Sequence, residues 1–168
     1  MPPSTRGCDV DGYVREVVTE GSPAPDFELS GDDGRHVRLS DIRGSPVVVF
    51  FYPKDDTPGC TVEACAFRDV YDEFVERGAV VLGVSPDDEA SHQRFKAKYG
   101  LQFRLLADPD HEAAEAYDVS VERERNGKRS RGIKRSTFVI APDGTVAKAM
   151  YAVRPEGHAA EVLDALPS

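Results

Sequence analysis

Two cysteines that lie five residues apart, Cys60 and Cys65, are the side chains of this sequence best suited to chemistry. A thiolate is a strong nucleophile that can pass through sulfenic acid and disulfide states, so two nearby thiols can complete a redox cycle. The third cysteine, Cys8, stands far from this pair, and we expect it to take no part. The first question is therefore whether the sequence around Cys60 favours its thiolate.

The residues before Cys60 predict such a position. Thr57 is a suitable helix N-cap and Pro58 suits the first helical position, which places Cys60 in the first turn of a helix. An ordinary thiol is only about 3% ionised at pH 7, and a helix N-terminus favours the ionised form. Pro53 and Pro58 stiffen the connection, and we expect the Thr57 hydroxyl close to the Cys60 sulfur. The alternative for Cys60 is a small buried hydrophobic residue.

Cys65 has two open interpretations, either a redox partner of Cys60 or a core residue beside Ala66. In an intact helix, Cα atoms five residues apart are separated by ~8.6 Å. A disulfide tolerates a Cα separation below ~7 Å. Pairing of the two cysteines therefore requires the first turns of the helix to unwind.

The elements that position this segment follow from hydrophobic patterns. Residues 47–52 form a continuous β-branched and aromatic run between two prolines, which predicts a strand buried on both faces. Apolar residues at helical spacing predict one helix from Pro58 to Arg77, ended by Gly78. The carboxyl end of a strand that meets a helix N-terminus is a usual place for a site in α/β proteins.

The rest of the chain continues the alternation of strands and helices. Residues 26–29 and 36–39 predict an N-terminal β-hairpin. Further elements are expected as strands at 80–84, 103–106, 136–140 and 146–151, and as helices at 88–99, 112–117 and 156–166. This order predicts an α/β fold with a central mixed β-sheet flanked by helices on both faces. We expect residues 1–13 to form a flexible N-terminal arm and residues 14–168 a single domain.

The composition narrows the class of protein. With 40% apolar and 30% charged residues, the chain is typical of globular proteins. Its net charge of −9 disfavours binding to nucleic acid or to anionic membranes, and we expect neither partner. No apolar run approaches the ~20 residues of a membrane span, and the N-terminus lacks the apolar run of a signal peptide, so we expect a cytoplasmic protein. Three cysteines are too few for a disulfide framework.

Two other groups of residues could form a binding site, for nucleic acid or for a metal ion. Residues 128–135 form the one basic cluster, which we interpret as a solvated loop that leads into a strand rather than a nucleic-acid patch. His36, His92, His111 and His158 lack the spacing of metal ligands, so we expect surface histidines and no metal site.

The segment from Pro53 to Cys65, PKDDTPGCTVEAC, resembles the active-site motif of peroxiredoxins, Pro-x-x-x-Thr-x-x-Cys. It is most similar to the motif of the bacterioferritin-comigratory-protein or Q-type subfamily. The resemblance extends from about Glu16 to Leu166, and residues 132–138 resemble the strand that carries the active-site arginine of the family.

This resemblance implies a thioredoxin-like fold with an added N-terminal hairpin. It implies that Cys60 is the peroxidatic cysteine, that Cys65 is the resolving cysteine, and that Pro53, Thr57 and Arg135 complete the site. The implied substrates are hydrogen peroxide and organic hydroperoxides. The implied cycle passes through a Cys60 sulfenic acid and an intramolecular disulfide that thioredoxin or a similar dithiol reduces.

The resemblance also implies that no cofactor is needed, and that the protein is a monomer or a weak homodimer. The chemistry expected of Arg135 is intelligible by itself, because a guanidinium stays charged and can donate to both a thiolate and a peroxide oxygen. Thr57 is expected to orient one peroxide oxygen.

Two other functions stay open at this point. A disulfide oxidoreductase of the thioredoxin fold would act on protein substrates, but its usual Cys-x-x-Cys motif is missing. A non-enzymatic binding module would require Cys60 to be buried and unreactive.

Overall fold

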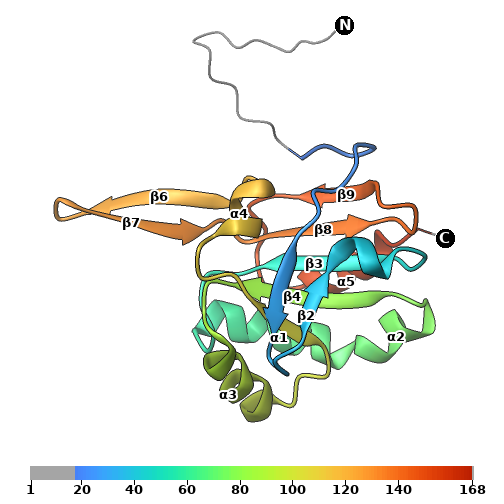
Figure 1. Cartoon of the computed structure of the whole chain (residues 1–168). Helices are drawn as coiled ribbons and strands as arrows, with labels where there is room; N and C mark the ends of the chain where they lie inside the picture. The colour runs from blue at the N-terminus through green and yellow to red at the C-terminus, as the bar shows by residue number, and fades with distance from the viewer. Residues whose placement is uncertain (1–17, 168) are drawn as a thin grey trace, which may run out of the picture.

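The computed structural model describes residues 18–167, and the predicted arm with Cys8 lies outside them. A mixed seven-stranded sheet crosses the middle of this part of the chain, in the order β2-β1-β5-β4-β3-β8-β9 (Figure 1). Its strands are β1 (Glu28–Gly31), β2 (His36–Arg38), β3 (Val47–Phe51), β4 (Val80–Ser85), β5 (Arg104–Ala107), β8 (Ser136–Ile140) and β9 (Val146–Met150). The predicted mixed sheet and N-terminal hairpin are confirmed.

Strand β3 is buried along its whole length, as its continuous apolar run predicts. It pairs in parallel with β4 and antiparallel with β8, and Phe51 at its end lies opposite Val84 and Ser136. Because β8 runs antiparallel to β3, the start of β8 lies beside the carboxyl end of β3. The residue just before β8, Arg135, is thereby brought to the turn that leaves β3.

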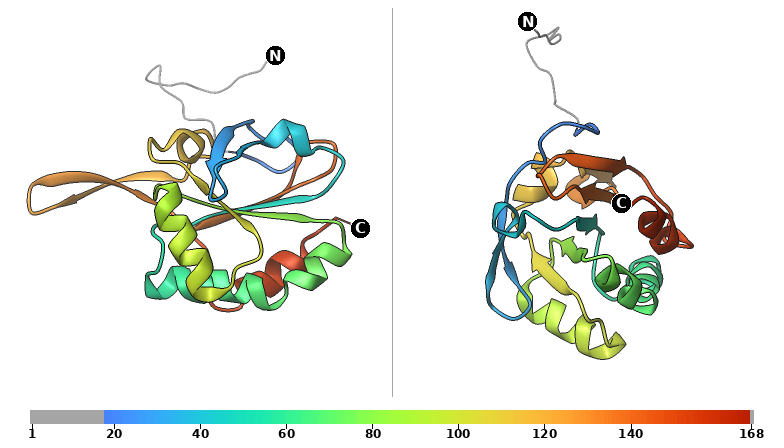
Figure 2. Two further views of the ribbon diagram at one scale, coloured as in Figure 1. Left: turned by 60° about the horizontal axis from the view of Figure 1, so that its bottom comes forward. Right: turned by 90° about the vertical axis from the view of Figure 1, so that its right-hand side faces the viewer.

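Helices cover both faces of the sheet, as predicted, but unequally (Figure 2). Their bounds are α1 (Pro58–Asp69), α2 (Tyr71–Glu76), α3 (Glu89–Tyr99), α4 (Glu112–Ala116) and α5 (His158–Asp164), with a 3-10 turn η2 (Leu39–Ile42). Apolar side chains of α1, α2, α3 and α5 share one core with the sheet. Side chains of α4, η2 and the hairpin β1–β2 form the core on the other face.

The prediction of one helix from Pro58 to Arg77 is wrong. The backbone leaves the helical region at Val70, with φ −113° and ψ 16°, so α1 ends at Asp69 and α2 begins at Tyr71. A β-branched residue has a weaker preference for the helix, which makes the break less costly there. The hydrophobic pattern could not reveal the break, because Phe67 and Phe74 on either side still face the same core, with ring centroids 5.8 Å apart.

The prediction of a solvated loop at 128–135 is also wrong. Strands β6 (Ser120–Arg125) and β7 (Lys128–Ile133) form a separate antiparallel ribbon that projects from the sheet (Figure 1). Asn126 and Gly127 join them with positive φ values of 54° and 79°. Two consecutive residues with positive φ form the tight turn that matches the twist of a β-hairpin. The Asn-Gly pair in the sequence therefore predicts this hairpin, and we overlooked this signal.

The expectation of surface histidines holds only for His36. His92, His111 and His158 are buried, and each has a ring nitrogen in a hydrogen bond with a side chain of the protein. Within residues 18–167, no cluster of histidine, cysteine and carboxylate side chains could hold a metal ion. None of the helices in this range has the length and hydrophobicity needed to cross a membrane.

Candidate active site

Cys60 lies in the first turn of α1, directly after the turn that follows β3. Thr57 is the N-cap residue and Pro58 opens the helix, as the sequence predicts. Only 2% of Cys60 is exposed, and its thiol is free. The shielded thiol therefore lies at the end of α1 where the unpaired backbone N–H groups carry partial positive charge.

Thr57 differs from its prediction in one respect. Its hydroxyl donates to the carbonyl of Lys54 at 2.8 Å and makes no cap hydrogen bond to α1. The turn brings this carbonyl within reach, so the single hydroxyl proton closes the turn and is not available to the Cys60 sulfur. The oxygen lone pairs of Thr57 remain able to accept a proton from a bound peroxide.

Arg135 lies in the site although it follows Cys60 by 75 residues in the sequence. Its Nη2 donates to the Cys60 sulfur at 3.5 Å, and its Nη1 donates to Glu63 Oε1 at 2.7 Å. Burial lowers the pKa of Arg135, but Glu63 and Cys60 raise it above its ordinary value, so the guanidinium stays charged. A fixed cation at this distance stabilises a thiolate and the oxyanion character that develops during its attack.

Glu63 is the site residue that sequence reasoning missed. It is fully buried in α1, and its second carboxylate oxygen has no hydrogen-bond partner among the described residues. Burial raises the pKa of Glu63 to about 7, although Arg135 acts in the opposite direction. The available signal was a carboxylate three residues after Cys60, on the same face of the helix as the buried Ala64 and Phe67.

Gly59 makes room for this arrangement. A Cβ atom at this position would lie 2.9 Å from Nη2 of Arg135 and 3.7 Å from Cγ of Pro155. The guanidinium therefore packs over the helix N-terminus where any larger residue would push it away. The requirement is for space, since Gly59 is not among the glycines with positive φ.

Cys65 lies about one and a half turns further along α1, half-buried and with a free thiol. It is not among the residues of either hydrophobic core, which disfavours the interpretation of Cys65 as a core residue. Both cysteines lie within the intact α1, so the helical Cα separation of ~8.6 Å applies to them.

Pro53 lies half-buried in the turn between β3 and α1. Two parts of the chain therefore form the site. One is the turn after β3 together with the first turn of α1, and the other is the residue just before β8. Of the predicted site residues, Pro53, Thr57 and Cys60 share this turn and first helical turn, and Arg135 meets them there.

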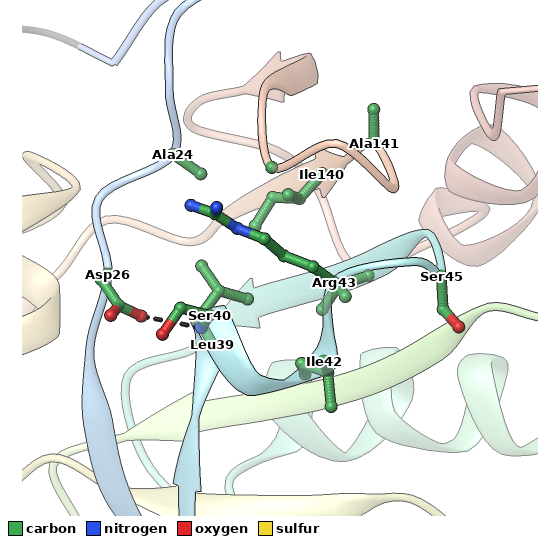
Figure 3. A pocket seen from close by; sticks show the side chains of 11 residues that line it. Ala24, Asp26, Leu39, Ser40, Ile42, Arg43, Ser45, Ile140 and Ala141 are labelled. Atoms are coloured by element: carbon green, nitrogen blue, oxygen red, sulfur yellow. Dashed lines mark hydrogen bonds between the residues drawn. The ribbon is translucent and has the colours of Figure 1, made fainter.

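A small hollow elsewhere contains none of these residues (Figure 3). It measures about 20 Å³ and lies at the start of β3, opposite the end that leads to Cys60. Figure 3 shows the Arg43 side chain across it, and Asp26 accepts a hydrogen bond from the backbone N–H of Ser40 at 2.9 Å. Its size suits at most a single water molecule, so it is no candidate for a substrate site.

Comparison with known proteins gives a consistent result. Residues 21–149 match the AhpC/TSA family. The chain is 49% identical over 150 residues to peroxiredoxin Bcp of Bacillus subtilis, covering 89% of this chain and 96% of that protein. It is 44% identical over 168 residues to the chloroplastic peroxiredoxin Q of Oryza sativa subsp. japonica, covering 99% of this chain and 74% of that protein.

Solved structures with the same fold are similar in sequence as well. The bacterioferritin comigratory protein of Xanthomonas campestris, studied for its alkyl peroxide reduction activity, superposes with a TM-score of 0.82 at 40% identity. That match covers 88% of this chain and 96% of the other. A cysteine-to-serine mutant of PrxQ from Xylella fastidiosa also has a TM-score of 0.82, at 35% identity, covering 89% and 95% of the two chains.

Proposed function

The chain belongs to the AhpC/TSA family as a thioredoxin-fold peroxiredoxin of the bacterioferritin-comigratory-protein or Q type and is a thiol-dependent peroxidase, and on this premise we propose that Cys60 is its peroxidatic cysteine and Cys65 its resolving cysteine. The observation that carries the proposal is the Arg135 guanidinium, 3.5 Å from a shielded Cys60 sulfur at the start of a helix. This arrangement excludes most solvent and still supplies positive charge to the sulfur.

The first step is a nucleophilic displacement on oxygen. The Cys60 thiolate attacks one oxygen of the hydroperoxide, an S–O bond forms, and the O–O bond breaks. The departing oxygen takes up a proton and leaves as water or an alcohol, while Cys60 becomes a sulfenic acid. In this step Arg135 stabilises the developing charge, and the lone pairs of Thr57 orient the peroxide proton. Pro53 stiffens the turn.

The second step joins the two cysteines. The Cys65 thiol attacks the Cys60 sulfenic acid, an S–S bond forms, and water leaves. An external dithiol, which we propose to be thioredoxin, reduces this disulfide by thiol exchange and returns both thiols. The first turns of α1 have to unwind for the S–S bond to form, because the helical Cα separation exceeds what a disulfide tolerates.

The proposed substrates are hydrogen peroxide and organic hydroperoxides. Organic hydroperoxides are supported by the similarity to the Xanthomonas campestris protein studied for alkyl peroxide reduction. We propose a cytoplasmic location, where a free thiol pair is kept reduced between cycles, and a monomer or weak homodimer as the active form.

Two substitutions test the roles of the cysteines. Cys60→Ser should abolish peroxide consumption, and turnover at the normal rate in this variant would refute the assignment. Cys65→Ser should complete one fast turnover and then stall with thioredoxin as the reductant. Full steady-state turnover in that variant would make Cys65 a structural residue.

The pairing itself is tested by mass spectrometry of peptides after one equivalent of peroxide. The expected product is a disulfide between Cys60 and Cys65 within one chain. A disulfide to Cys8, or between two chains, would contradict the proposed resolution step. Peroxidase assays with a small dithiol and with thioredoxin as alternative reductants test the proposed donor.

A further inference from the structure

Two consecutive aspartates of the turn between β3 and α1, Asp55 and Asp56, both bind helix α3. We propose that α3 holds this turn in place while the first turns of α1 unwind, so that Asp55, Asp56 and His92 are positioning residues for Cys60. This inference rests on the proposed roles of Cys60 and Cys65.

Asp55 forms the buried attachment. Its carboxylate accepts from Tyr52 Oη at 2.6 Å, from Ser91 Oγ at 2.8 Å and from His92 Nδ1 at 2.7 Å. Its backbone N–H donates to Asp87 Oδ2 at 2.7 Å. With only 8% of Asp55 exposed, these four bonds connect it to Tyr52 directly after β3, to Asp87 between β4 and α3, and to α3 itself.

Both ring nitrogens of His92 take part in this network. It is fully buried, and its second ring nitrogen, Nε2, lies 2.9 Å from the carbonyl oxygen of Leu106. A carbonyl and an ionised carboxylate can only accept, so a protonated His92 satisfies both of these partners by donating from its two ring nitrogens. Burial lowers the pKa of His92, but the contact with Asp55 outweighs this effect and raises it above its ordinary value. With His92 protonated, the attachment is a buried and hydrogen-bonded ion pair, and such a pair is costly to separate.

Asp56 forms the exposed attachment at the other end of α3. Its carboxylate oxygens lie 2.8 Å from Lys98 Nζ and 2.8 Å from the Tyr99 hydroxyl. Its backbone is left-handed, with φ 59°, which is a strained conformation for most residues and a tolerated one for aspartate. The side-chain bonds thus hold a backbone conformation that the turn needs.

Helix α3 is well secured as a support. Asp88 caps its start by accepting from the Ser91 N–H at 2.9 Å, and Gly100 ends it in the left-handed conformation. Lys96 forms an ion pair with the largely buried Asp32 at 3.0 Å, which ties α3 to the hairpin β1–β2. The turn is therefore bound to an element that is itself fixed at several points.

Tyr99 also bounds the segment that has to unwind. Its hydroxyl donates to Asp56, and its carbonyl accepts from Arg68 Nη1 at 2.8 Å. Residues 57–67, which include both Cys60 and Cys65, lie between these two contacts. The first turn of α1 lacks a side-chain cap, and its first bond is the one from the Thr61 N–H to the Thr57 carbonyl. The two contacts with Tyr99 of α3 therefore bound the segment that has to unwind.

The exposed attachment gives the sharper test, because its loss should leave the core intact. Asp56→Gly keeps a residue that accepts the left-handed backbone but removes both side-chain contacts. We expect the rate constant for peroxide with Cys60 to fall, and the rate of disulfide formation with Cys65 to rise. The ratio of the two should change by roughly 2- to 5-fold, as expected for loss of an exposed ion pair.

The measurement is single-turnover stopped flow, with peptide mass spectrometry to count disulfide against overoxidised Cys60. Because a loosened turn favours the unwound form, less Cys60 should reach the sulfinic acid at high peroxide concentration. The matched control is Glu28→Ala, which removes an exposed carboxylate 2.7 Å from Arg38 on the hairpin β1–β2. This control should leave both rate constants unchanged.

The buried attachment is tested by His92→Gln together with Asp55→Asn, which replaces an ion pair by two neutral amides and strands no charge. The double variant should change the same ratio in the same direction. An unchanged ratio in both Asp56→Gly and the double variant, while each variant still forms the disulfide, would overturn the proposal. Failure of the unmodified protein to join Cys60 to Cys65 would instead refute the proposed function.

Discussion

Gly59→Ala should separate the stability of this protein from its activity. The added Cβ would lie 2.9 Å from Arg135 Nη2, whereas ordinary contacts begin near 3.4 Å, so the guanidinium has to retreat by about 0.5 Å. This group is the end of a flexible side chain, and moving it costs the fold little. The movement weakens its contact with the Cys60 sulfur, which is 3.5 Å long at the outset.

The two effects have opposite signs. A hydrogen bond to a charged group is worth about 1.5–3 kcal/mol, so its loss should reduce the rate constant for peroxide by about 10- to 100-fold. Alanine is a better helix former than glycine by about 0.5–1 kcal/mol, so the free energy of unfolding should stay equal or rise slightly.

The assay combines stopped-flow oxidation of Cys60 with denaturant unfolding of the reduced protein. Thr61→Ala is the matched control, because it changes helix propensity in the same turn of α1 and adds no atom near Arg135. A normal rate constant in Gly59→Ala would refute the reasoning, since it would mean that the position of the guanidinium does not limit the reaction. A large loss of stability would also refute it.

Three further predictions concern the same site and its support. Arg135→Lys keeps the charge but cannot donate in a fork to both Glu63 and Cys60, so stopped flow should show a rate constant at least about tenfold lower; an unchanged value would contradict the need for two donors. Because burial raises the pKa of Glu63 from 4.5 to about 7, ionisation of this residue opposes folding, and the free energy of unfolding should fall by up to about 3 kcal/mol as the pH rises through this interval. Unfolding curves at several pH values should show this dependence, and a Glu63→Gln variant that retained it would exclude Glu63 as its source. Gly83→Ala would place a Cβ 2.8 Å from Phe50 Cζ in the core, so it should lower the free energy of unfolding by about 1–3 kcal/mol. The rate constant of the folded protein for peroxide should not change. An unaltered denaturation midpoint would contradict this prediction.

The local part of the site was predictable from the sequence because its signals are local. A proline at the first helical position and a buried strand before it fix where Cys60 lies, whatever the rest of the chain does. Most strands and helices were predicted within a few residues of their observed bounds for the same reason. The break at Val70 was missed, because a hydrophobic pattern reports which face is buried and not whether the backbone is continuous.

The long-range part of the site was not predictable from patterns. Glu63 and Arg135 are 72 residues apart, and only the antiparallel pairing of β3 with β8 brings them together. The place of Arg135 in the site came from resemblance to a family, not from physical reasoning on the residues. The buried contact of Asp55 with His92 was also missed, because the two residues are 37 positions apart and nothing in the sequence around either one indicates that it is buried.

The register between β3 and β8 has a consequence for insertions and deletions. Phe51 lies opposite Ser136, so Arg135 reaches Cys60 only if the chain enters β8 at this register. Deletion of one residue within β8 would shift the entry by ~3.3 Å and turn alternate side chains to the other face of the sheet. The ribbon β6–β7 just before it carries no such constraint, because residues added in pairs at its tip leave the Ser120 and Ile133 ends in place. Length variation in this protein should therefore be tolerated at Asn126 and Gly127, and a peptide tag inserted there should leave peroxidase activity intact.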